Sequence, residues 1–312
     1  MYHRVGNEAV DPWGLAVTPT HFGQHMDVLR RTREVVPLTV FVSHLQAETL
    51  PANAAVVTFD DGYVDNLTVA KPSLAKAGLP ATVFLATGFL NQKDEFWWDE
   101  LARLILLGAE STHLAITVRD KTMRFDLDDN RSNQSRGWRA WHDGPRTLRQ
   151  EAYLTIWRTL RDLRLEERDT AMAQIRSALA QRLTSTGSGR PMTSAEVRSL
   201  VSDGLIAIGA HTVTHPVLTE LPASDRIREI TESRITCGTL CGSEVHTFAY
   251  PFGSVNPAVR ADVVKAAFTC GCSTKDGPAV SGSDIFALPR KHVFNLDGDA
   301  FERSLRYGFS GD

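Results

Sequence analysis

Two adjacent carboxylates and a pair of closely spaced histidines are the residues of this chain best suited to chemistry. Asp60 and Asp61 stand in the segment Thr-Phe-Asp-Asp-Gly, directly after an apolar run. His211 and His215 also follow an apolar run, with three residues between them. Two neutral imidazoles and one carboxylate form a common catalytic zinc site, with a further coordination position open to water. One carboxylate could therefore bind a metal while its neighbour stays available as a base.

Each of these segments also has a plain structural interpretation. Asp-Asp-Gly is a frequent turn composition, and a single histidine is often a hydrogen-bonded core residue. A third segment, Thr-Phe-Ala-Tyr-Pro-Phe-Gly at 247–253, can present a backbone N–H and a flat apolar wall to a ligand, or can be a packed turn. Taken one at a time, the segments leave both interpretations open.

The pattern around these segments predicts how they are positioned. Apolar runs alternate with helical stretches, which indicates a parallel sheet with helical crossovers, either open or closed as a barrel. Active sites of such folds lie beyond the carboxyl ends of the strands. We expect strands at 54–59, 81–85, 205–209, 247–250, 268–273 and 286–294, and helices at 69–77, 194–203, 223–240 and 255–267. The segment Thr-Ser-Ala-Glu at 193–196 predicts a capping box at the start of the second of these helices.

The alternation breaks between about residues 95 and 190, which we interpret as an insertion within a single domain spanning residues 1–312. Leu114 to Leu127 alternates as a hairpin does, residues 145–183 are helical in pattern, and 184–189 have a linker composition. Residues 131–190 hold 12 arginines, no lysine and 6 acids. This excess fits either a basic lid for an anionic substrate or, as we favour, a helix face with ion pairs.

Composition narrows the class of protein. The chain has 312 residues, of which 42% are hydrophobic and 23% charged, and its net charge is −3. These values are those of an ordinary globular protein and argue against a nucleic-acid partner. The apolar stretch at 101–109 is far too short to span a membrane. The sequence lacks the Gly-rich phosphate-binding motifs and the paired-histidine helix motif of zincins.

Location and cysteine chemistry are predicted from the same features. The first residues show no basic segment followed by an apolar run, so we expect no signal peptide and a cytoplasmic protein, although a chain that opens on a strand could lack an upstream segment. The cysteines form no CxxC pair, and we expect buried free thiols in a reducing compartment. The sequence does not predict the oligomeric state.

Together the three segments resemble the NodB-type polysaccharide deacetylases, a family of metal-dependent carbohydrate esterases, in their exopolysaccharide-type variant. TFDDG matches the first family motif, HTVTH matches His-(Ser/Thr)-x-x-His, and AYPFG stands where the family has Arg-x-Pro-Tyr. The resemblance covers about residues 55–294. It implies an α/β fold, a distorted (β/α)7 barrel with an inserted hairpin-plus-helical segment at 95–190.

The resemblance also implies a reaction and a set of metal ligands. Asp61, His211 and His215 would bind a divalent metal, Zn²⁺ before Co²⁺, Ni²⁺ or Fe²⁺, and Asp60 would be the general base. The reaction would be hydrolysis of the N-acetyl group of an amino sugar in a saccharide or glycan precursor, with release of acetate. Within AYPFG, Phe252 would donate its backbone N–H to the oxyanion, and Tyr250 would join it in binding substrate.

The chain departs from the family pattern at two functions. Ala249 stands where the family has an arginine that holds the general base. The family's late Leu-x-His motif, which supplies the general acid, is not matched residue for residue in this chain. The nearest substitute is Leu-Pro-Arg-Lys-His-Val at 288–293. Residues two apart on a strand face the same side, so Arg290 could hold Asp60 while His292 protonates the leaving amine. His3 is a rival for the acid.

Two alternatives to deacetylation stay open. A deformylase or another hydrolase of C–N amides could use the same barrel, because a pocket discriminates one methyl group by only about 1–3 kcal/mol. A non-catalytic saccharide-binding module could have lost the motif arginine. Contact between Arg290 and Asp60 would favour an enzyme, whereas an outward-pointing Arg290 would favour the binding module.

Overall fold

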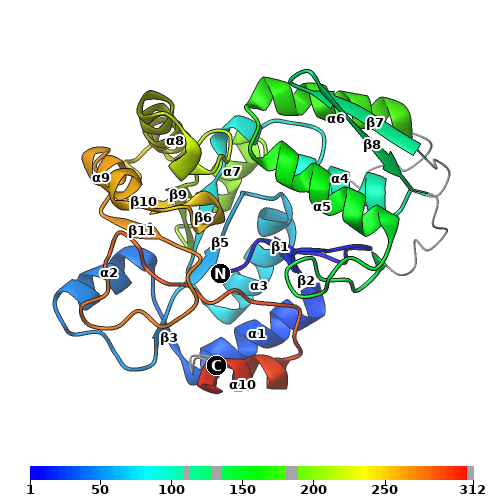
Figure 1. Ribbon diagram of the computed structural model, residues 1–312. Helices are drawn as coiled ribbons and strands as arrows, with labels where there is room; N and C mark the ends of the chain where they lie inside the picture. The colour runs from blue at the N-terminus through cyan, green and yellow to red at the C-terminus, as the bar shows by residue number, and fades with distance from the viewer. Residues whose placement is uncertain (109–112, 128–134, 180–188, 308–312) are drawn as a thin grey trace. The chain divides into compact units, whose positions relative to one another are not determined.

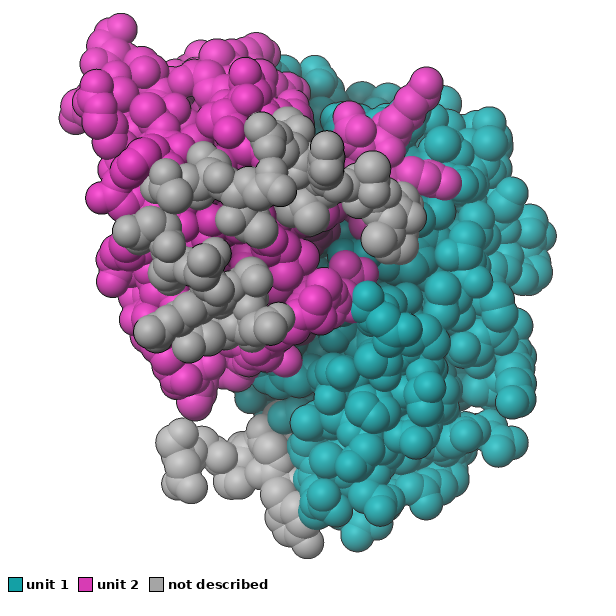
Figure 2. Space-filling model, turned by 90° about the vertical axis from the view of Figure 1, so that its right-hand side faces the viewer, with its two compact units in different colours: residues 1–7, 16–92, 191–312 teal, residues 8–15, 93–190 magenta. Residues whose placement is uncertain are grey.

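The computed structural model describes residues 1–108, 113–127, 135–179 and 189–307 (Figure 1). The chain divides into two compact units, coloured separately in Figure 2. Unit 1 comprises residues 1–7, 16–92 and 191–312, and unit 2 comprises residues 8–15 and 93–190. Unit 2 thus contains the expected insertion together with a short N-terminal segment. All the site residues expected from the sequence belong to unit 1.

A parallel five-stranded sheet forms the centre of unit 1, in the order β11-β10-β9-β6-β5 (Figure 1). Its strands are β5 (Val57–Phe59), β6 (Ala81–Leu85), β9 (Ile206–Ala210), β10 (Thr247–Ala249) and β11 (Cys270–Cys272). Nearly all their residues are buried. A parallel strand covered on both faces needs a continuous apolar sequence, which is why these runs show little alternation.

Helices and short helical turns connect the strands of unit 1. They are α1 (Pro19–Thr32), α2 (Leu38–Gln46), η1 (Asn66–Ala70), α3 (Lys71–Ala77), η2 (Thr87–Phe89), α7 (Ser194–Val201), η4 (Leu218–Glu220), α8 (Ala223–Cys241), η5 (Pro251–Gly253), α9 (Pro257–Lys265) and α10 (Gly298–Tyr307). The expected capping box is present at the start of α7, where Thr193 and Glu196 exchange hydrogen bonds. Such a box satisfies two backbone donors that a helix start leaves without partners.

Two short segments continue the sheet beyond its outer strands. On the β5 side, Tyr2 N donates to Thr58 O over 2.8 Å, and Asp60 N donates to Tyr2 O over 3.0 Å. On the β11 side, Ser273 N donates to Leu288 O over 2.8 Å. Val293 N then donates to Met1 O, which links the two segments to each other. The five strands and these two extended segments occupy the seven strand positions of a distorted (β/α)7 barrel.

The expected strand at 286–294 is wrong. This stretch makes only an isolated parallel bridge between Cys272 and Leu288. Pro289 follows the bridge and has no N–H to donate, so a regular ladder cannot continue through it. The expected strand at 54–59 is also divided, into β4 (Ala54–Ala55), which pairs with β3 (Glu34–Val35), and β5. The small parallel pair β1 (Arg4–Val5) and β2 (Ala16–Val17) completes the strands of unit 1.

The described part of unit 2 contains a hairpin and three α-helices. The hairpin joins β7 (His113–Val118) to β8 (Lys121–Asp126), and the helices are α4 (Trp97–Leu106), α5 (Leu148–Arg161) and α6 (Leu165–Leu179). The expected hairpin is therefore confirmed. Its two turn residues, Arg119 and Asp120, both have positive φ, as a two-residue turn between twisted strands favours. Most of the expected linker at 184–189 lies outside the described residues.

Ion pairs occupy several arginines of unit 2. Arg176 donates two hydrogen bonds to Glu100, each over 2.7 Å, and Arg161 pairs with Asp162. Arg168 is buried, with its guanidinium 5.3 Å from the centre of the Trp97 ring. Arg161 and Arg176 thus form ion pairs of the kind expected for a helix face with ion pairs. No helix in the described parts of the chain is long and apolar enough to cross a membrane.

A buried histidine in unit 1 predicts that the fold loses stability in acid. His25 lies on α1, with its ring stacked on Phe301 of α10 at 4.0 Å and its Nε2 2.7 Å from Leu296 O. Burial lowers the pKa of His25 to about 4, although the Leu296 carbonyl opposes the shift. Its pKa in the unfolded chain is about 6.5, so the unfolded state takes up the proton first. Stability should fall by roughly 2–3 kcal/mol as the pH drops from about 6.5 towards 4.

Urea unfolding at pH 7 and pH 4.5 measures this loss. The variant His25→Gln has no proton to gain, so its stability should differ less between the two pH values than that of the wild type. An equal acid-induced loss in both proteins would show that His25 is not responsible.

Candidate metal-binding active site

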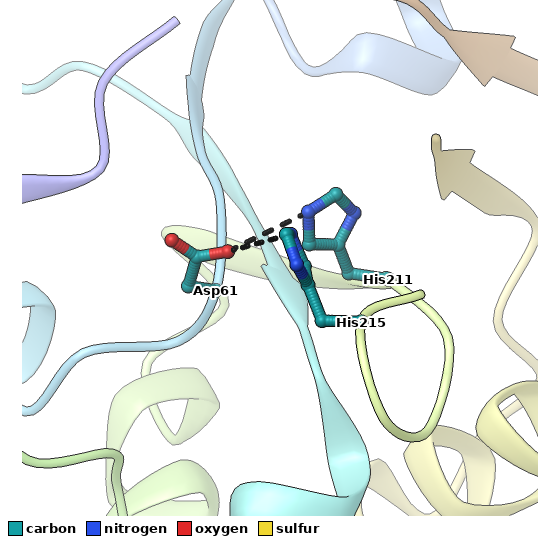
Figure 3. A group of neighbouring side chains, drawn as sticks. All are labelled: Asp61, His211 and His215. Atoms are coloured by element: carbon teal, nitrogen blue, oxygen red, sulfur yellow. Dashed lines mark ion pairs between the residues drawn. The ribbon is translucent and has the colours of Figure 1, made fainter. Parts of the chain in front are cut away.

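Asp61, His211 and His215 converge at the carboxyl ends of β5 and β9 (Figure 3). Asp61 Oδ1 lies 3.6 Å from His211 Nε2 and 3.4 Å from His215 Nε2, and all three side chains are buried. Zinc bonds of about 2.0–2.2 Å in tetrahedral geometry place neighbouring ligand atoms about 3.4 Å apart. The donor set and its spacing therefore fit a divalent metal ion.

The hydrogen bond of His211 selects the tautomer that a metal requires. His211 Nδ1 lies 2.8 Å from Ala249 O. A carbonyl oxygen only accepts, so Nδ1 carries the proton and Nε2 turns its lone pair towards Asp61. Burial lowers the pKa of His211, with Asp60 opposing the shift. The imidazole is thus kept neutral, which is the form that binds metal.

Unusual backbone conformations are concentrated at this site. Of the nine non-glycine residues with positive φ in the described parts of the chain, four belong to the three motif segments: Asp61, Thr212, His215 and Phe252. Each such conformation costs free energy and persists only where the surroundings impose it. Gly62 follows Asp61 with φ +87°, and a Cβ there would lie 2.7 Å from Leu85 Cδ2. The surrounding structure therefore imposes a specific backbone conformation on the Asp-Asp-Gly turn, and this conformation positions Asp61.

Asp60 is held by an arginine from a distant part of the chain. Arg290 Nη1 and Nη2 donate to the two carboxylate oxygens of Asp60, each over 2.7 Å, and Arg290 Nε donates to Ser273 O over 2.9 Å. Burial alone would raise the pKa of Asp60, but the charge and hydrogen bonds of Arg290, together with His211, hold it well below its usual range. Asp60 is therefore an ionised carboxylate in a fixed orientation.

The structure places the two candidate acids near each other. The rings of His3 and His292 are 5.5 Å apart, and His292 also packs against Phe294 at 4.5 Å. Burial lowers the pKa of His3 to about 3, and the charge of Asp60 opposes this shift. Its Nδ1 is buried and has no hydrogen-bond partner within the described part of the chain. His3 thus has a buried polar atom without a partner in the described residues, and its ring is close enough to Asp60 for the two to interact electrostatically.

The two aromatic residues of the third segment differ in placement. The Phe252 ring is 38% exposed and lies edge to face with His215, 4.6 Å between ring centres. Tyr250 is buried, packs against Phe248 and donates its hydroxyl to Phe286 O over 2.7 Å. The structure therefore brings Phe252 to the metal ligands, whereas the side chain of Tyr250 is occupied in the core.

Several groups that support the site were not singled out from the sequence. They are the carbonyls of Ala249 and Ser273, the backbone of Thr87 and Gly88, and the carboxylate of Glu229. Backbone carbonyls carry no residue-type signal, and a glutamate on a helix is most often a solvated residue. The sequence offered no pattern that could have found them.

Comparison with known protein families identifies the family to which this chain belongs. A model of the polysaccharide deacetylase family matches residues 47–114 and 170–271, more than half of the chain. The chain belongs to the polysaccharide deacetylase family. It is therefore a carbohydrate deacetylase by family, and both matched ranges contain metal-ligand candidates. Residues 115–169, between the two ranges, are most of the expected insertion.

Solved structures share the fold of this deacetylase at low sequence identity. The deacetylase PplD of Streptococcus pyogenes, in complex with acetate, has a TM-score of 0.60 at 15% identity, covering 97% of this chain and 94% of that one. IcaB from Ammonifex degensii gives 0.57 at 16%, covering 99% and 100%. A de-N-acetylase from Aggregatibacter actinomycetemcomitans gives 0.55 at 14%, covering 96% and 94%. A search of curated sequences found no significant match.

The buried pair of Asp60 and Arg290 predicts strongly coupled effects on stability. Removing one partner leaves an uncompensated buried charge, which typically costs about 3–5 kcal/mol. Arg290→Met should lower the free energy of unfolding by that amount, and the double variant Asp60→Asn/Arg290→Met should lose much less than the sum of the single losses. Urea unfolding of the four proteins provides the double-mutant cycle. Additive losses would contradict the pairing.

Proposed function

We propose that this chain hydrolyses the N-acetyl group of an amino sugar in a saccharide or glycan precursor, using a divalent metal held by Asp61, His211 and His215. The observation that carries the proposal is the position of the ionised Asp60–Arg290 pair directly beside a three-ligand set. When bound, the ion, Zn²⁺ by preference, lowers the pKa of a water molecule and polarises the carbonyl of the acetyl group.

Asp60 acts as the general base in this proposal. Each carboxylate oxygen offers two lone-pair sites, so Asp60 can receive a proton from water while Arg290 still donates to it. Arg290 keeps the carboxylate ionised and fixes its direction. The function of the motif arginine, absent at Ala249, is thereby supplied from residue 290.

The leaving amine needs a proton donor, and His3 and His292 are the two candidates. His292 was the first choice from the sequence, on the assumption of a strand that the structure lacks. His3 is favoured by its buried Nδ1, which has no hydrogen-bond partner in the described part of the chain. Because burial lowers its pKa to about 3, its ring is neutral at rest, and in this proposal it receives the proton that Asp60 takes from water and passes it to the amine. We therefore assign the proton transfer to this pair of imidazoles, with His3 as the residue that gives the proton to the leaving amine.

The segment at 250–253 completes the proposed site. The backbone N–H of Phe252 is proposed to donate to the oxyanion, an interaction typically worth about 3–4 kcal/mol. The exposed ring of Phe252 supplies an apolar wall beside His215. The hydroxyl of Tyr250 already donates to Phe286 O, so we propose that Tyr250 supports the substrate-binding segment through its backbone and not through its side chain.

Metal content provides the first test. Purified wild-type protein should contain about one zinc or similar divalent ion per chain, whereas His211→Ala should contain little or none, because two ligands hold such an ion weakly. Elemental analysis measures the ratio, and the surface variant His44→Ala is the matched histidine control. A wild-type protein that takes up no metal even after incubation with zinc would rule out the proposed mechanism.

Product analysis provides the second test. On N-acetylated amino sugars the wild-type enzyme should release acetate, and Asp60→Asn should lower kcat by about 10²–10⁴-fold, the usual contribution of a general base, while retaining its metal. In the same assay His3→Ala should lower kcat more than His292→Ala. Release of formate from an N-formyl substrate in place of acetate would select the deformylase, and metal-replete protein that binds sugars without turnover would select the binding module.

A further inference from the structure

The loop between the two histidine ligands is held from both sides. Its residues 212–214 join His211 to His215, and both Thr212 and His215 have positive φ, at 66° and 56°. A three-residue loop of this kind does not keep such a shape by itself. Its backbone hydrogen bonds show which groups impose it.

On one side, a single buried carboxylate accepts three hydrogen bonds from the loop. Glu229, on α8 and 6% exposed, accepts from Val213 N over 2.7 Å and from Thr214 N over 2.9 Å through Oε2. Its Oε1 accepts from Thr214 Oγ1 over 2.7 Å. Only a carboxylate can accept with both of its oxygens without bringing a donor of its own into the cluster.

On the other side, the backbone of η2 donates to the loop carbonyls. Thr87 N donates to Thr212 O over 3.0 Å, and Gly88 N donates to Val213 O over 2.8 Å. A Cβ on Gly88 would lie 2.7 Å from Val213 O. This close approach requires glycine, because any side chain would push the loop away.

Hydrogen bonds at the ends of the loop attach the ligands themselves. His211 N donates to Leu85 O over 2.9 Å, and His215 N donates to Thr212 Oγ1 over 3.1 Å. The clamp formed by Glu229 and Gly88 therefore fixes the segment on which both imidazoles are mounted. Among the described residues, Glu229 is not one of the three side chains whose ligand atoms gather at the candidate metal site.

We propose that Glu229 is a positioning residue that sets the metal affinity of the site by holding the loop at 212–214 against the η2 backbone. The inference rests on the proposed metal site. Groups that orient metal ligands typically contribute 10–100-fold in metal affinity. With Glu229→Ala, two partly buried amides and one hydroxyl lose their acceptor, and the two imidazoles are no longer held at a common point.

Two readouts on the full chain test this proposal, one with metal and one without. Zinc affinity is measured by competition with a chelator, and hydrogen exchange of the amides at 211–215 is measured on metal-free protein. Glu229→Ala should bind zinc 10–100-fold more weakly, and the amides of Val213 and Thr214 should exchange at least about tenfold faster, since their acceptor is gone. Glu229→Gln should give a smaller effect on both, because its amide oxygen can still accept from the two N–H groups.

A matched control separates positioning from general stability. Asp262 on α9 is another buried helix carboxylate, 8% exposed and paired with Arg226 over 2.6 Å. Asp262→Ala should lower overall stability while leaving both zinc affinity and loop exchange as in the wild type. If Glu229→Ala fails to fold, Thr214→Val removes one of the three hydrogen bonds and should still weaken zinc binding by a few-fold.

Wild-type zinc affinity and loop exchange in Glu229→Ala, or in Thr214→Val where that variant is needed, would overturn the proposal. A wild-type chain that binds no zinc would instead overturn the proposed metal site. The exchange measurement on metal-free protein would then still decide whether Glu229 holds the loop.

Discussion

Two carboxylates that are neighbours in sequence and both buried set the main constraint on this fold. An ionised carboxylate cannot leave water unless a positive charge or several donors face it. Asp60 meets that requirement through a two-pronged hydrogen bond from Arg290. Asp61 instead faces the imidazoles of His211 and His215, a set that gains positive charge when a cation is bound. Because their partners differ, the two adjacent aspartates are suited to different roles: Asp60 is held in an ion pair, and Asp61 is placed to bind a cation.

The partner of Asp60 depends on how the barrel closes. Arg290 lies in a stretch that is not a regular strand but is fixed on both sides, by Leu288 against β11 and by Val293 against Met1. This arrangement places a guanidinium beside β5 although it comes from the far end of the chain. Asp60 is therefore held by Arg290 although position 249 is an alanine, and the carbonyl oxygen of Ala249 orients His211.

The sequence could predict the elements whose pattern reflects burial alone. The strand at 81–85, the capping box at Thr193 and the hairpin around Asp120 agree with the structure because each follows from local chemistry. The prediction of a strand at 286–294 is wrong, because Pro289 interrupts its β-like composition and its pairing partners are distant in sequence. The metal-ligand candidates could be found because they are motif residues. Their supports could not, since backbone carbonyls and a helix glutamate have no distinctive spacing.

The pairing of Asp60 with Arg290 joins residues 230 positions apart. A contact of such long range requires the closing of a large loop, whose entropy cost must be overcome before the contact contributes to stability. A chain that has made its first strands and its histidine loop, but has not yet placed the 288–293 segment, would hold a buried carboxylate without its counter-charge. Asp60, the proposed general base, therefore obtains its counter-charge only once the 288–293 segment has closed against the first strands of the chain.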